Sequence, residues 1–365
     1  MTYAVRPGFL HAVLPAGIDD PARPSGGNRY DRRALDGLRQ RGRAVVEHEI
    51  AGAWPRPGAG DLARLDDTLA RLADDSLVLV DGLVATGAGS VLTSHGARLR
   101  VVVLLHMPVG PDPGEAEALH AAVAVVTTSA WSQARVVESY GLPRVEVCCP
   151  GTDPAPPVRG SGVGGGTSFL CVAAVHPGKG HDVLLDALSH LGDRAWTLTC
   201  VGSLEVDPDH VAGLQTQVYA RSWERRVIFT GPLTGHDLDA AYDGSDLVVL
   251  PSRFESYGMV VAEALARGLP VVASAVGGVV EAFGSAPAGA MPGLLVQPDD
   301  PAALTAALLA WLDDPALRER LGRFAERRRT SARGWDAVAA DLDRVLTAVE
   351  TGPRPGLHAR AGGRR

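Results

Sequence analysis

The sequence is short of cysteine, lysine and long apolar runs, and each shortage narrows the choice of fold or function. The four cysteines all lie in apolar, strand-like runs, without Cys-x-x-Cys spacing and without a nearby histidine cluster: Cys148, Cys149, Cys171 and Cys200. This pattern is typical of small core residues and excludes a disulfide framework or a zinc site. Of the 35 lysine and arginine residues only one is lysine, Lys179, which singles it out for closer attention.

An excess of positive charge is also missing. The net charge of −7 and the isoelectric point near 5.9 predict no general attraction to nucleic acid or to anionic lipid. No apolar run approaches the length of a membrane span, and the first residues, MTYAVRPGFLHAVLPAG, lack the features of a secretion signal. We therefore expect a cytoplasmic protein. Peripheral membrane contact through the arginine-rich residues 29–43 is less favoured, because no strong apolar face accompanies them.

The length of the chain and its alternating pattern indicate two α/β domains. At 365 residues the chain exceeds the size at which one hydrophobic core usually stops growing. Apolar runs typical of buried parallel strands alternate with helical segments, and this alternation is interrupted once, by a Pro/Gly/Ser-rich stretch. The expected strands lie at 9–16, 44–52, 77–83, 99–108, 122–130 and 145–151, and then at 169–175, 196–203, 226–231, 246–252, 270–276 and 293–298.

The domain boundaries follow from the same pattern. We expect an N-terminal Rossmann-like domain over 1–153, a linker over 154–167 and a C-terminal Rossmann-like domain over 168–335. A helix over 336–350 can pack back on the N-terminal domain, and a disordered tail over 351–365 ends the chain. The two doubly wound domains are expected to face each other across a cleft.

The lone lysine lies in AAVHPGKGHDVLL, between an expected strand and the following helix. Gly178 and Gly180 flank Lys179 and let the backbone approach a ligand, while the helix that starts near His181 directs its free N–H groups to the same place. We therefore expect an anion site, against the alternative of a surface lysine retained by chance. The Gly-x-x-x-x-Gly-Lys-Ser/Thr spacing of a Walker loop is absent, which argues against ATP hydrolysis.

Two glutamates occur in LPSRFESYGMVVAEALARGLPVVAS, which reads as strand, loop, helix and strand. Glu255 falls in the loop at the carboxyl edge of the sheet, where open α/β sheets bind ligands. Glu263 falls about two turns inside a helix expected over 257–267, on a face shared with Met259 and Val260. A helical glutamate is often only structural, but a buried carboxylate needs a hydrogen-bond donor, and a ligand with hydroxyl groups supplies one.

The N-terminal half offers weaker signals. Gly26 and Gly27 follow the first strand and open a helix, where backbone amides can meet a phosphate or an acceptor, although such a pair is most often just a turn. Six arginines follow this pair: Arg29, Arg32, Arg33, Arg39, Arg41 and Arg43. We interpret them as a solvated helix face, and contact with an anionic acceptor is the less favoured alternative.

Three further residues end apolar runs. His106 follows the apolar run VVVLL, at the expected carboxyl edge of the sheet. A functional histidine and a hydrogen-bonded core histidine are equally favoured interpretations of this position. Asp81 in VDGL and Asp153 in PGTD are weaker candidates, since both residue types also cap or end strands.

With these residues assembled, the chain resembles the retaining glycosyltransferases of family 4, nucleotide-sugar enzymes of GT-B fold. Glu255 and Glu263 match that family's pair of glutamates separated by seven residues, and Gly277, Gly278 and Glu281 follow in register. Further matches are SGG at 25–27, LLHMP around His106, PGTD at the domain join, KG at 179–180, VGS at 201–203 and FTGPL at 229–233.

The resemblance implies a role for each matching residue. Lys179 would neutralise the donor diphosphate, and Glu263 would bind ribose hydroxyls. Glu255 would hold the donor sugar together with the backbone amides of Ser256, Tyr257 and Gly258. The turn that contains Gly231 and Leu233 would receive the base, and Gly26 and Gly27 would approach the phosphates. His106 would face the sugar and acceptor, and Asn28 and Arg29 are weaker acceptor candidates.

The resemblance further implies a metal-independent, retaining reaction with the nucleotide sugar as co-substrate, no resident cofactor, and a small-molecule or lipid-linked acceptor. One departure stands out, because Ala173 and Ala174 occupy positions where the family usually has Gly-Arg. His176, Arg253 or another arginine could supply the missing charge. Otherwise the chain is a nucleotide-sugar binding protein without catalysis, or a pseudo-glycosyltransferase, epimerase or hydrolase of the same fold.

Overall fold

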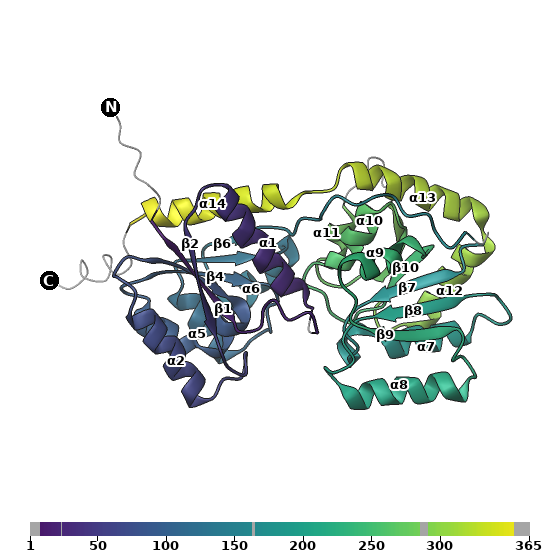
Figure 1. The fold of residues 1–365 in the computed structure, drawn as a ribbon, viewed down its shortest axis with the longest axis horizontal. Helices are drawn as coiled ribbons and strands as arrows, with labels where there is room; N and C mark the ends of the chain where they lie inside the picture. Colours follow the sequence, from purple (N-terminus) through teal and green to yellow (C-terminus); the bar gives the residue numbers. More distant parts are fainter. Residues whose placement is uncertain (1–7, 23, 163–164, 285–290, 354–365) are drawn as a thin grey trace. The chain divides into compact units, whose positions relative to one another are not determined.

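The computed structural model describes residues 8–22, 24–162, 165–284 and 291–353, and its elements divide between two compact units (Figure 1). Unit 1 comprises the chain up to residue 19, residues 27–150 and the chain from 335 onward, and unit 2 comprises residues 20–26 and 151–334. Residues 163–164 of the expected linker and 354–365 of the expected disordered tail lie outside the described residues.

Unit 1 is a six-stranded parallel sheet with the strand order β2-β1-β3-β4-β5-β6. Its elements are β1 (Leu10–Pro15), α1 (Gly26–Gln40), β2 (Val45–Ile50), α2 (Ala59–Ala70), β3 (Leu77–Asp81), α3 (Gly82–Gly87), α4 (Gly89–His95), β4 (Arg100–Leu105), α5 (Pro113–Ala121), β5 (Ala124–Thr127), α6 (Ala130–Tyr140), β6 (Val145–Val147) and α14 (Trp335–Thr351). The first residue of α1, Gly26, groups with unit 2.

Unit 2 repeats this architecture with the strand order β12-β11-β10-β7-β8-β9, again parallel throughout the described pairs. Its elements are β7 (Ser168–Val172), the 3-10 turn η1 (Pro177–Lys179), α7 (His181–Ser189), β8 (Thr197–Val201), α8 (Pro208–Ala220), β9 (Val227–Gly231), α9 (Gly235–Asp243), β10 (Leu247–Leu250), α10 (Met259–Ala266), β11 (Val271–Ser274), α11 (Val279–Phe283), β12 (Gly293–Val296), α12 (Pro301–Asp313) and α13 (Pro315–Thr330). The expected doubly wound α/β fold is therefore confirmed, with a strand in every expected run.

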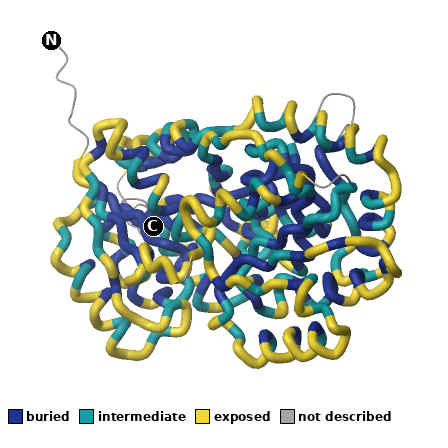
Figure 2. The backbone as a smooth tube through the Cα atoms, turned by 45° about the vertical axis from the view of Figure 1, so that its right-hand side comes forward, coloured by how far each residue is buried: buried dark blue, intermediate teal, exposed yellow. Residues whose placement is uncertain are grey.

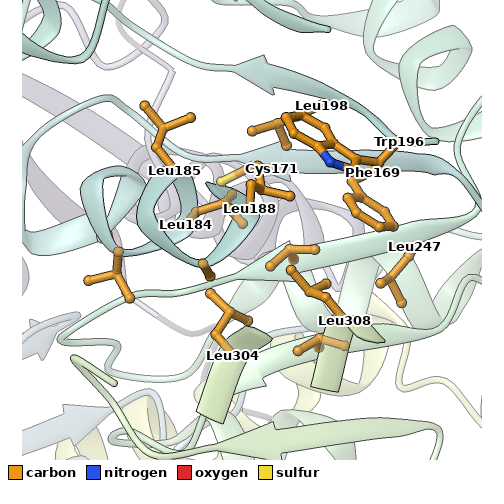
Figure 3. Packing of buried hydrophobic residues seen from close by; sticks show 14 of the residues in the cluster. Phe169, Cys171, Leu184, Leu185, Leu188, Trp196, Leu198, Leu247, Leu304 and Leu308 are labelled. Carbon is orange, nitrogen blue, oxygen red and sulfur yellow. The ribbon is translucent and has the colours of Figure 1, made fainter. Parts of the chain in front are cut away.

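The central strands carry the core of each unit. Every residue of β3, β4, β5, β10 and β11 is buried, and these strands contribute to the dark blue interior in Figure 2. Helices cover both faces of a parallel sheet, so its strands consist of almost continuous Val, Ile and Leu. In unit 2, Phe169, Leu198 and Leu247 of the sheet pack with Leu184 and Leu188 of α7 and with Leu304 and Leu308 of α12 (Figure 3).

The C-terminal helix α14 belongs to unit 1. Gly37 of α1 lies so close to Ala339 that a Cβ atom on it would stand 2.5 Å from the alanine methyl group. Arg43 is buried and binds Asp343, Thr347 and Glu350 at 2.9 to 3.1 Å, and Arg100 donates to the carbonyls of Val349 and Gly352. These contacts hold α14 on the unit.

Candidate functional site

Lys179 and Glu255 meet where the strand order of the second sheet reverses. β7 and β10 are neighbours in that sheet, although β8 and β9 separate them in sequence. Lys179 follows β7, Glu255 follows β10, and Lys179 Nζ lies 2.6 Å from Glu255 Oε1. Ser252 donates to the same carboxylate oxygen at 2.8 Å. Open α/β sheets bind their ligands at such a switch point, outside the carboxyl ends of the strands.

A tight turn places Lys179 beside the N-terminus of a helix. His176 accepts a hydrogen bond on Nδ1 from the amide of Gly178 at 3.2 Å and thereby caps η1. Gly180 then has φ +67° and lies so close to Pro251 that a Cβ atom would stand 2.1 Å from the carbonyl oxygen of Pro251. Only glycine fits there. The helix α7 begins at His181, two residues after Lys179, so the lysine lies beside the end of a helix that favours negative charge.

Arg253, one of the residues suggested for the second charge, is paired with two carboxylates of the same unit. Its guanidinium group binds the two carboxylate oxygens of Asp182 at 2.7 and 2.9 Å and also lies 2.7 Å from Asp299. The hydrogen bonds that Arg253 donates to Asp182 raise the pKa of Arg253. Burial works to raise the pKa of Asp182, but the hydrogen bonds from Arg253 hold it below its usual value. This pair joins the loop after β10 to the first turn of α7.

The loop that carries Glu255 is held against the loop after β11. Gly277, at φ +53°, approaches so closely that a Cβ atom would stand 1.6 Å from the carbonyl oxygen of Glu255, and the amide of Gly278 donates to that oxygen at 3.2 Å. Ser256 is half-buried and Tyr257 and Gly258 are buried just before α10 begins. The backbone around Glu255 is therefore closely packed.

Glu263 is a buried carboxylate with a partner inside the protein. It is 8% exposed, and the hydroxyl of Tyr242 donates to its Oε2 at 3.2 Å. Arg267 stacks on the Tyr242 ring at 4.4 Å and donates to the carbonyl of Glu263. The expectation that Glu263 lies two turns inside its helix is wrong, because α10 begins at Met259 and Glu263 is its fifth residue. The left-handed Gly258 keeps residues 257–258 out of the helix.

Gly231 and Leu233 lie farther along the same sheet. Gly231 ends β9, the edge strand, and its carbonyl accepts a hydrogen bond from Gly202 at 3.0 Å, while Leu233 is half-buried in the loop before α9. Within the described part of the chain, no hydrogen bond joins either residue to Lys179 or Glu255. Asp153 is half-buried near the start of unit 2, and neither sheet contains it.

In unit 1, His106 lies against two carboxylates. It follows β4, and its Nε2 lies 2.7 Å from Asp31 Oδ1 of α1 and 3.5 Å from Asp81 Oδ2 at the end of β3. Asp31 and Asp81 are 2% and 4% exposed, so both carboxylates are removed from water. Gly27 packs on the same imidazole, since a Cβ atom there would stand 3.2 Å from His106 Cδ2. Asn28 and Arg29 are half-buried in the first turn of α1.

Burial and charge act on this cluster in opposite directions. Burial tends to lower the pKa of His106, but the negative charge of Asp31 and the hydrogen bond to it raise the pKa above the ordinary value. Burial and the neighbouring charge of Asp31 raise the pKa of Asp81 to about 7. Oδ1 of Asp81 also accepts from the amides of Leu83 and Val84 and so caps α3.

Asp31 is the residue that the sequence analysis missed. It stands among arginines, but Ala34, Leu35 and Leu38 follow at the spacing of one helix face, and that face is buried. An acidic residue on the apolar face of a helix is the signal that could have found it.

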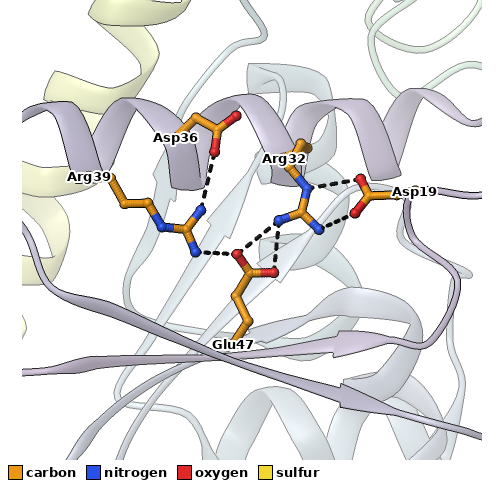
Figure 4. Close-up of polar contacts among 5 residues, drawn as sticks. All are labelled: Asp19, Arg32, Asp36, Arg39 and Glu47. Atoms are coloured by element: carbon orange, nitrogen blue, oxygen red, sulfur yellow. Dashed lines mark hydrogen bonds and ion pairs between the residues drawn. The ribbon is translucent and has the colours of Figure 1, made fainter.

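The expected solvated face of arginines is confirmed for Arg33, Arg39 and Arg41, which are exposed, and is wrong for Arg43, which is buried. Figure 4 shows the ion pairs that Arg32 and Arg39 form. Arg32 binds Asp19 at 2.7 Å and Glu47 at 2.8 Å, and Arg39 pairs with Glu47 and Asp36. Arg43 lies beyond the end of α1 and is buried against α14. The β2 strand presents Glu47 to α1, where it pairs with both Arg32 and Arg39.

Comparisons with known proteins match this chain to glycosyl transferases. Residues 163–328 match the family model described as glycosyl transferases group 1. A D-inositol 3-phosphate glycosyltransferase of Kineococcus radiotolerans is 33% identical over 270 residues, which cover 67% of this chain and 61% of that protein. A glycogen synthase of Mycobacterium tuberculosis is 38% identical over 130 residues, which cover 36% of this chain and 30% of that protein. The chain thus spans less than two thirds of the length of these relatives.

Solved structures match the fold over a larger share of the chain. Sucrose-phosphate synthase of Thermosynechococcus elongatus has a TM-score of 0.75 at 20% identity, with 94% of this chain and 99% of that chain covered. HepE of Anabaena, solved in complex with UDP-glucose, has a TM-score of 0.74 at 19% identity, with 93% and 99% covered. In the described part of the chain, no helix is both long and apolar enough to cross a membrane. The chain therefore has the GT-B fold, and its residues 163–328 match the family model of glycosyl transferases group 1.

Proposed function

We propose that the chain transfers a sugar from a nucleotide-diphosphate donor to a small-molecule or lipid-linked acceptor, with retention of configuration and without a metal ion. The observation that carries this proposal is the Lys179–Glu255 pair at the β7/β10 switch point, inside the segment that matches group 1 glycosyl transferases. Relatives named as D-inositol 3-phosphate glycosyltransferases and a neighbour of the same fold in complex with UDP-glucose support the donor class.

Unit 2 would hold the donor. The ammonium group of Lys179 and the N-terminus of α7 suit a diphosphate, because both attract negative charge to one place. Glu255, with the amides of Ser256, Tyr257 and Gly258, would bind sugar hydroxyls, and Glu263 would accept from the ribose. Gly231 and Leu233 would border the base.

The proposed reaction needs charge stabilisation more than acid–base chemistry. The acceptor oxygen would bond to the anomeric carbon on the face from which the diphosphate leaves, and the acceptor proton would pass to the departing diphosphate. Lys179 would stabilise the negative charge that develops on the leaving group, because a fixed cation away from bulk water favours it throughout the reaction. Glu255 would orient the sugar and is not assigned a covalent role.

Unit 1 would supply the acceptor side. His106 lies at the carboxyl edge of its sheet, and Gly27, Asn28 and Arg29 form the first turn of α1 nearby. We assign His106 to the sugar and acceptor, Gly26 and Gly27 to the phosphates, and Asn28 and Arg29 to weaker contacts with the acceptor.

Calorimetric titration with UDP, GDP, ADP, CDP and dTDP tests the donor site. One nucleotide should bind tightly, and Lys179→Ala and Glu263→Ala should each weaken it. Arg194→Ala is the matched control, because Arg194 forms a surface ion pair with Asp313 in the same unit. If none of the five nucleotides binds, the chain shares the fold of these enzymes without their donor site.

Turnover separates the remaining alternatives. The matching nucleotide sugar is incubated with and without a mixture of candidate acceptors, and donor loss is followed by chromatography. A transferase consumes donor only when an acceptor is present, and the product retains the anomeric configuration by NMR. Loss of donor without acceptor indicates an epimerase or hydrolase, and binding without any loss indicates a non-catalytic protein.

A further inference from the structure

The Asp31–His106–Asp81 cluster contains a buried atom that the described hydrogen bonds leave unexplained. Asp31 Oδ1 is bound by His106, but Asp31 Oδ2 is buried and has no partner among the described residues. A carboxylate oxygen that is buried without a donor costs about 1–3 kcal/mol or more. The cluster therefore needs one more donor, and the carboxyl group of Asp81 belongs to the same cluster.

A shared proton between the two carboxyl groups accounts for this atom. One ligand atom from each of Asp31, Asp81 and His106 lies within 4.8 Å of the others. Two carboxylates in one cluster out of water repel one another when both are ionised, so a single proton held between them is favoured. The pKa of Asp81, which burial and the charge of Asp31 raise to about 7, agrees with this assignment.

The distances fit hydrogen bonds better than coordination of an ion. His106 Nε2 and Asp31 Oδ1 are 2.7 Å apart, the usual length of a charge-assisted hydrogen bond. Two ligands bound at about 2.0–2.2 Å to one tetrahedral ion are separated by about 3.3 Å or more. A proton, rather than a metal ion, therefore fits between these two atoms.

The arrangement leaves the two ring nitrogens of His106 in different surroundings. Nε2 points to Asp31, whereas Nδ1 makes no hydrogen bond with any described residue. The imidazole is 16% exposed, with Tyr30 edge-on to it at 5.2 Å. The charged groups that act on it are Asp31 from α1 and Asp81 from the end of β3.

We propose that Asp31 is a positioning residue that binds Nε2 of His106 and leaves Nδ1–H as a donor to a substrate oxygen, while Asp81 braces Asp31 through a shared proton. The inference rests on the proposed function for the identity of the substrate, a hydroxyl or phosphate oxygen of the donor or acceptor. The hydrogen bonds among Asp31, His106 and Asp81 are inferred from unit 1 alone and do not depend on the proposed function.

The hydrogen bonds can be tested on the full chain without any activity. The histidines are labelled with ¹⁵N, and the signals of His106 are assigned by their loss in His106→Gln. In the wild-type chain both Nε2 and Nδ1 should carry a proton at pH 7, because Nδ1–H is a donor beside a protonated Nε2 only in the imidazolium. A spectrum in which either nitrogen lacks its proton at pH 7 overturns the proposal, and this arm needs no variant of Asp31.

Two isosteric variants then separate the roles of the carboxyl groups. Asp31→Asn should make His106 titrate at a lower pH than in the wild type, because the charge that stabilises the imidazolium is gone. Asp81→Asn should preserve the protonated Nε2, because its amide group can still donate to Asp31 and its oxygen can still cap α3. If His106 titrates identically in Asp31→Asn and the wild type, Asp31 does not position it.

Another histidine–aspartate pair of the same unit gives the control. His95 Nε2 lies 2.8 Å from Asp66 Oδ1. His95 ends α4, before β4 begins, whereas His106 follows the end of β4. Asp66→Asn should leave the signals of His106 unchanged. Zinc and manganese are added to the wild type in parallel. If either ion removes the Nε2–H signal of His106 and raises Tm in the wild type but not in Asp31→Asn, the cluster is a metal site and the proposal is wrong.

Kinetics connect the cluster to the proposed reaction. With the donor found by calorimetry, Asp31→Asn should lower kcat/KM by about tenfold or more, as expected when a buried carboxylate that orients a histidine is lost. The alkaline limb of its pH profile should move to lower pH, while the affinity for the nucleotide alone stays unchanged. An unchanged profile overturns the assignment to substrate.

Failure of the proposed function and failure of this inference give different results. If Lys179→Ala does not affect nucleotide binding, the proposed function is contradicted, and the NMR result for His106 still decides whether the hydrogen bonds of the cluster are as proposed.

Discussion

The ammonium group of Lys179 lies 2.6 Å from the carboxylate of Glu255, although 76 residues separate them in the chain. Both side chains keep some access to solvent, with 19% and 13% of their surface exposed. A mostly buried pair of this kind adds little to stability, because the cost of removing two charges from water offsets their attraction. Its effect is to hold a cation and a hydrogen-bond acceptor in place at the switch point of the second sheet.

Replacing Lys179 with methionine should abolish the charge and keep most of the volume. We expect kcat/KM to fall by about 100-fold or more, because the loss of one fixed electrostatic contact in an active site costs about 10²–10³. Steady-state kinetics with the cognate donor provide the measurement, with Arg194→Met as the control. A fall of less than threefold would remove Lys179 from the proposed role.

Gly27→Ala should disturb His106 without unfolding unit 1. The new methyl group would stand 3.2 Å from Cδ2 and 3.4 Å from Cγ of the imidazole, so the ring must move by a few tenths of an ångström. We expect a lower kcat with a nearly unchanged Tm. Gly213→Ala in α8 is the matched control, since a Cβ atom there meets nothing within 4 Å, and it should stabilise the chain by about 0.5–1 kcal/mol. Equal activity of the two variants contradicts a role for the Gly27–His106 contact.

Tyr242→Phe should test the partner of Glu263. The hydroxyl of Tyr242 donates to Glu263 Oε2 at 3.2 Å in a buried place, so its loss should cost about 1.5–3 kcal/mol of unfolding free energy. Urea denaturation gives that value. We also expect weaker nucleotide binding by calorimetry, because the carboxylate is less well oriented. Wild-type values for both quantities would show that this hydrogen bond does not position Glu263.

Arg43→Ala should loosen α14 from unit 1. The buried guanidinium group binds Asp343 at 2.9 Å and Glu350 at 3.0 Å, and its removal leaves both carboxylates without this partner. We expect a loss of about 1.5–3 kcal/mol and faster amide hydrogen exchange in residues 335–351. Arg41→Ala is the control, because Arg41 is exposed and reaches Asp343 only at 3.4 Å. Unchanged exchange in α14 would mean that apolar packing alone holds the helix.

The stability of the chain should depend on pH through Asp81. Its pKa is raised to about 7 in the folded state, chiefly by burial, so between its ordinary value of 3.8 and about 7 the folded state binds more protons than the unfolded state. The contribution of Asp81 to the unfolding free energy is therefore complete below the ordinary value and decreases as the pH rises through about 7. Urea unfolding of the wild type and Asp81→Asn from pH 5 to 8 measures this, and the wild type should lose more stability with rising pH. Parallel curves would show that Asp81 does not titrate in this range.

Much of the fold and part of the site could be predicted from the sequence. Continuous apolar runs such as RVVVLL and LVVL predict buried parallel strands, because a strand covered on both faces cannot hold polar side chains. His106 follows such a run directly, and Lys179 and Glu255 lie in the segments between such a run and the next helix, so their places beyond the carboxyl ends of strands were also predictable. Gly180 follows from the same local reasoning, as the residue that lets the strand turn sharply into a helix.

Only the tertiary structure decided which of these residues meet. The strand order brings β7 beside β10 and so joins Lys179 to Glu255, and no local pattern specifies that order. Asp31 looked like one charge among arginines until the packing of α1 on the sheet turned its carboxylate toward His106. Arg253 and Arg43 likewise found buried or bridging partners on distant segments. The sequence by itself determined the elements and the residue at each strand end, because burial and backbone geometry act locally. The tertiary structure decided the pairs of charges, because a buried charge is stable only beside a partner that folding brings to it.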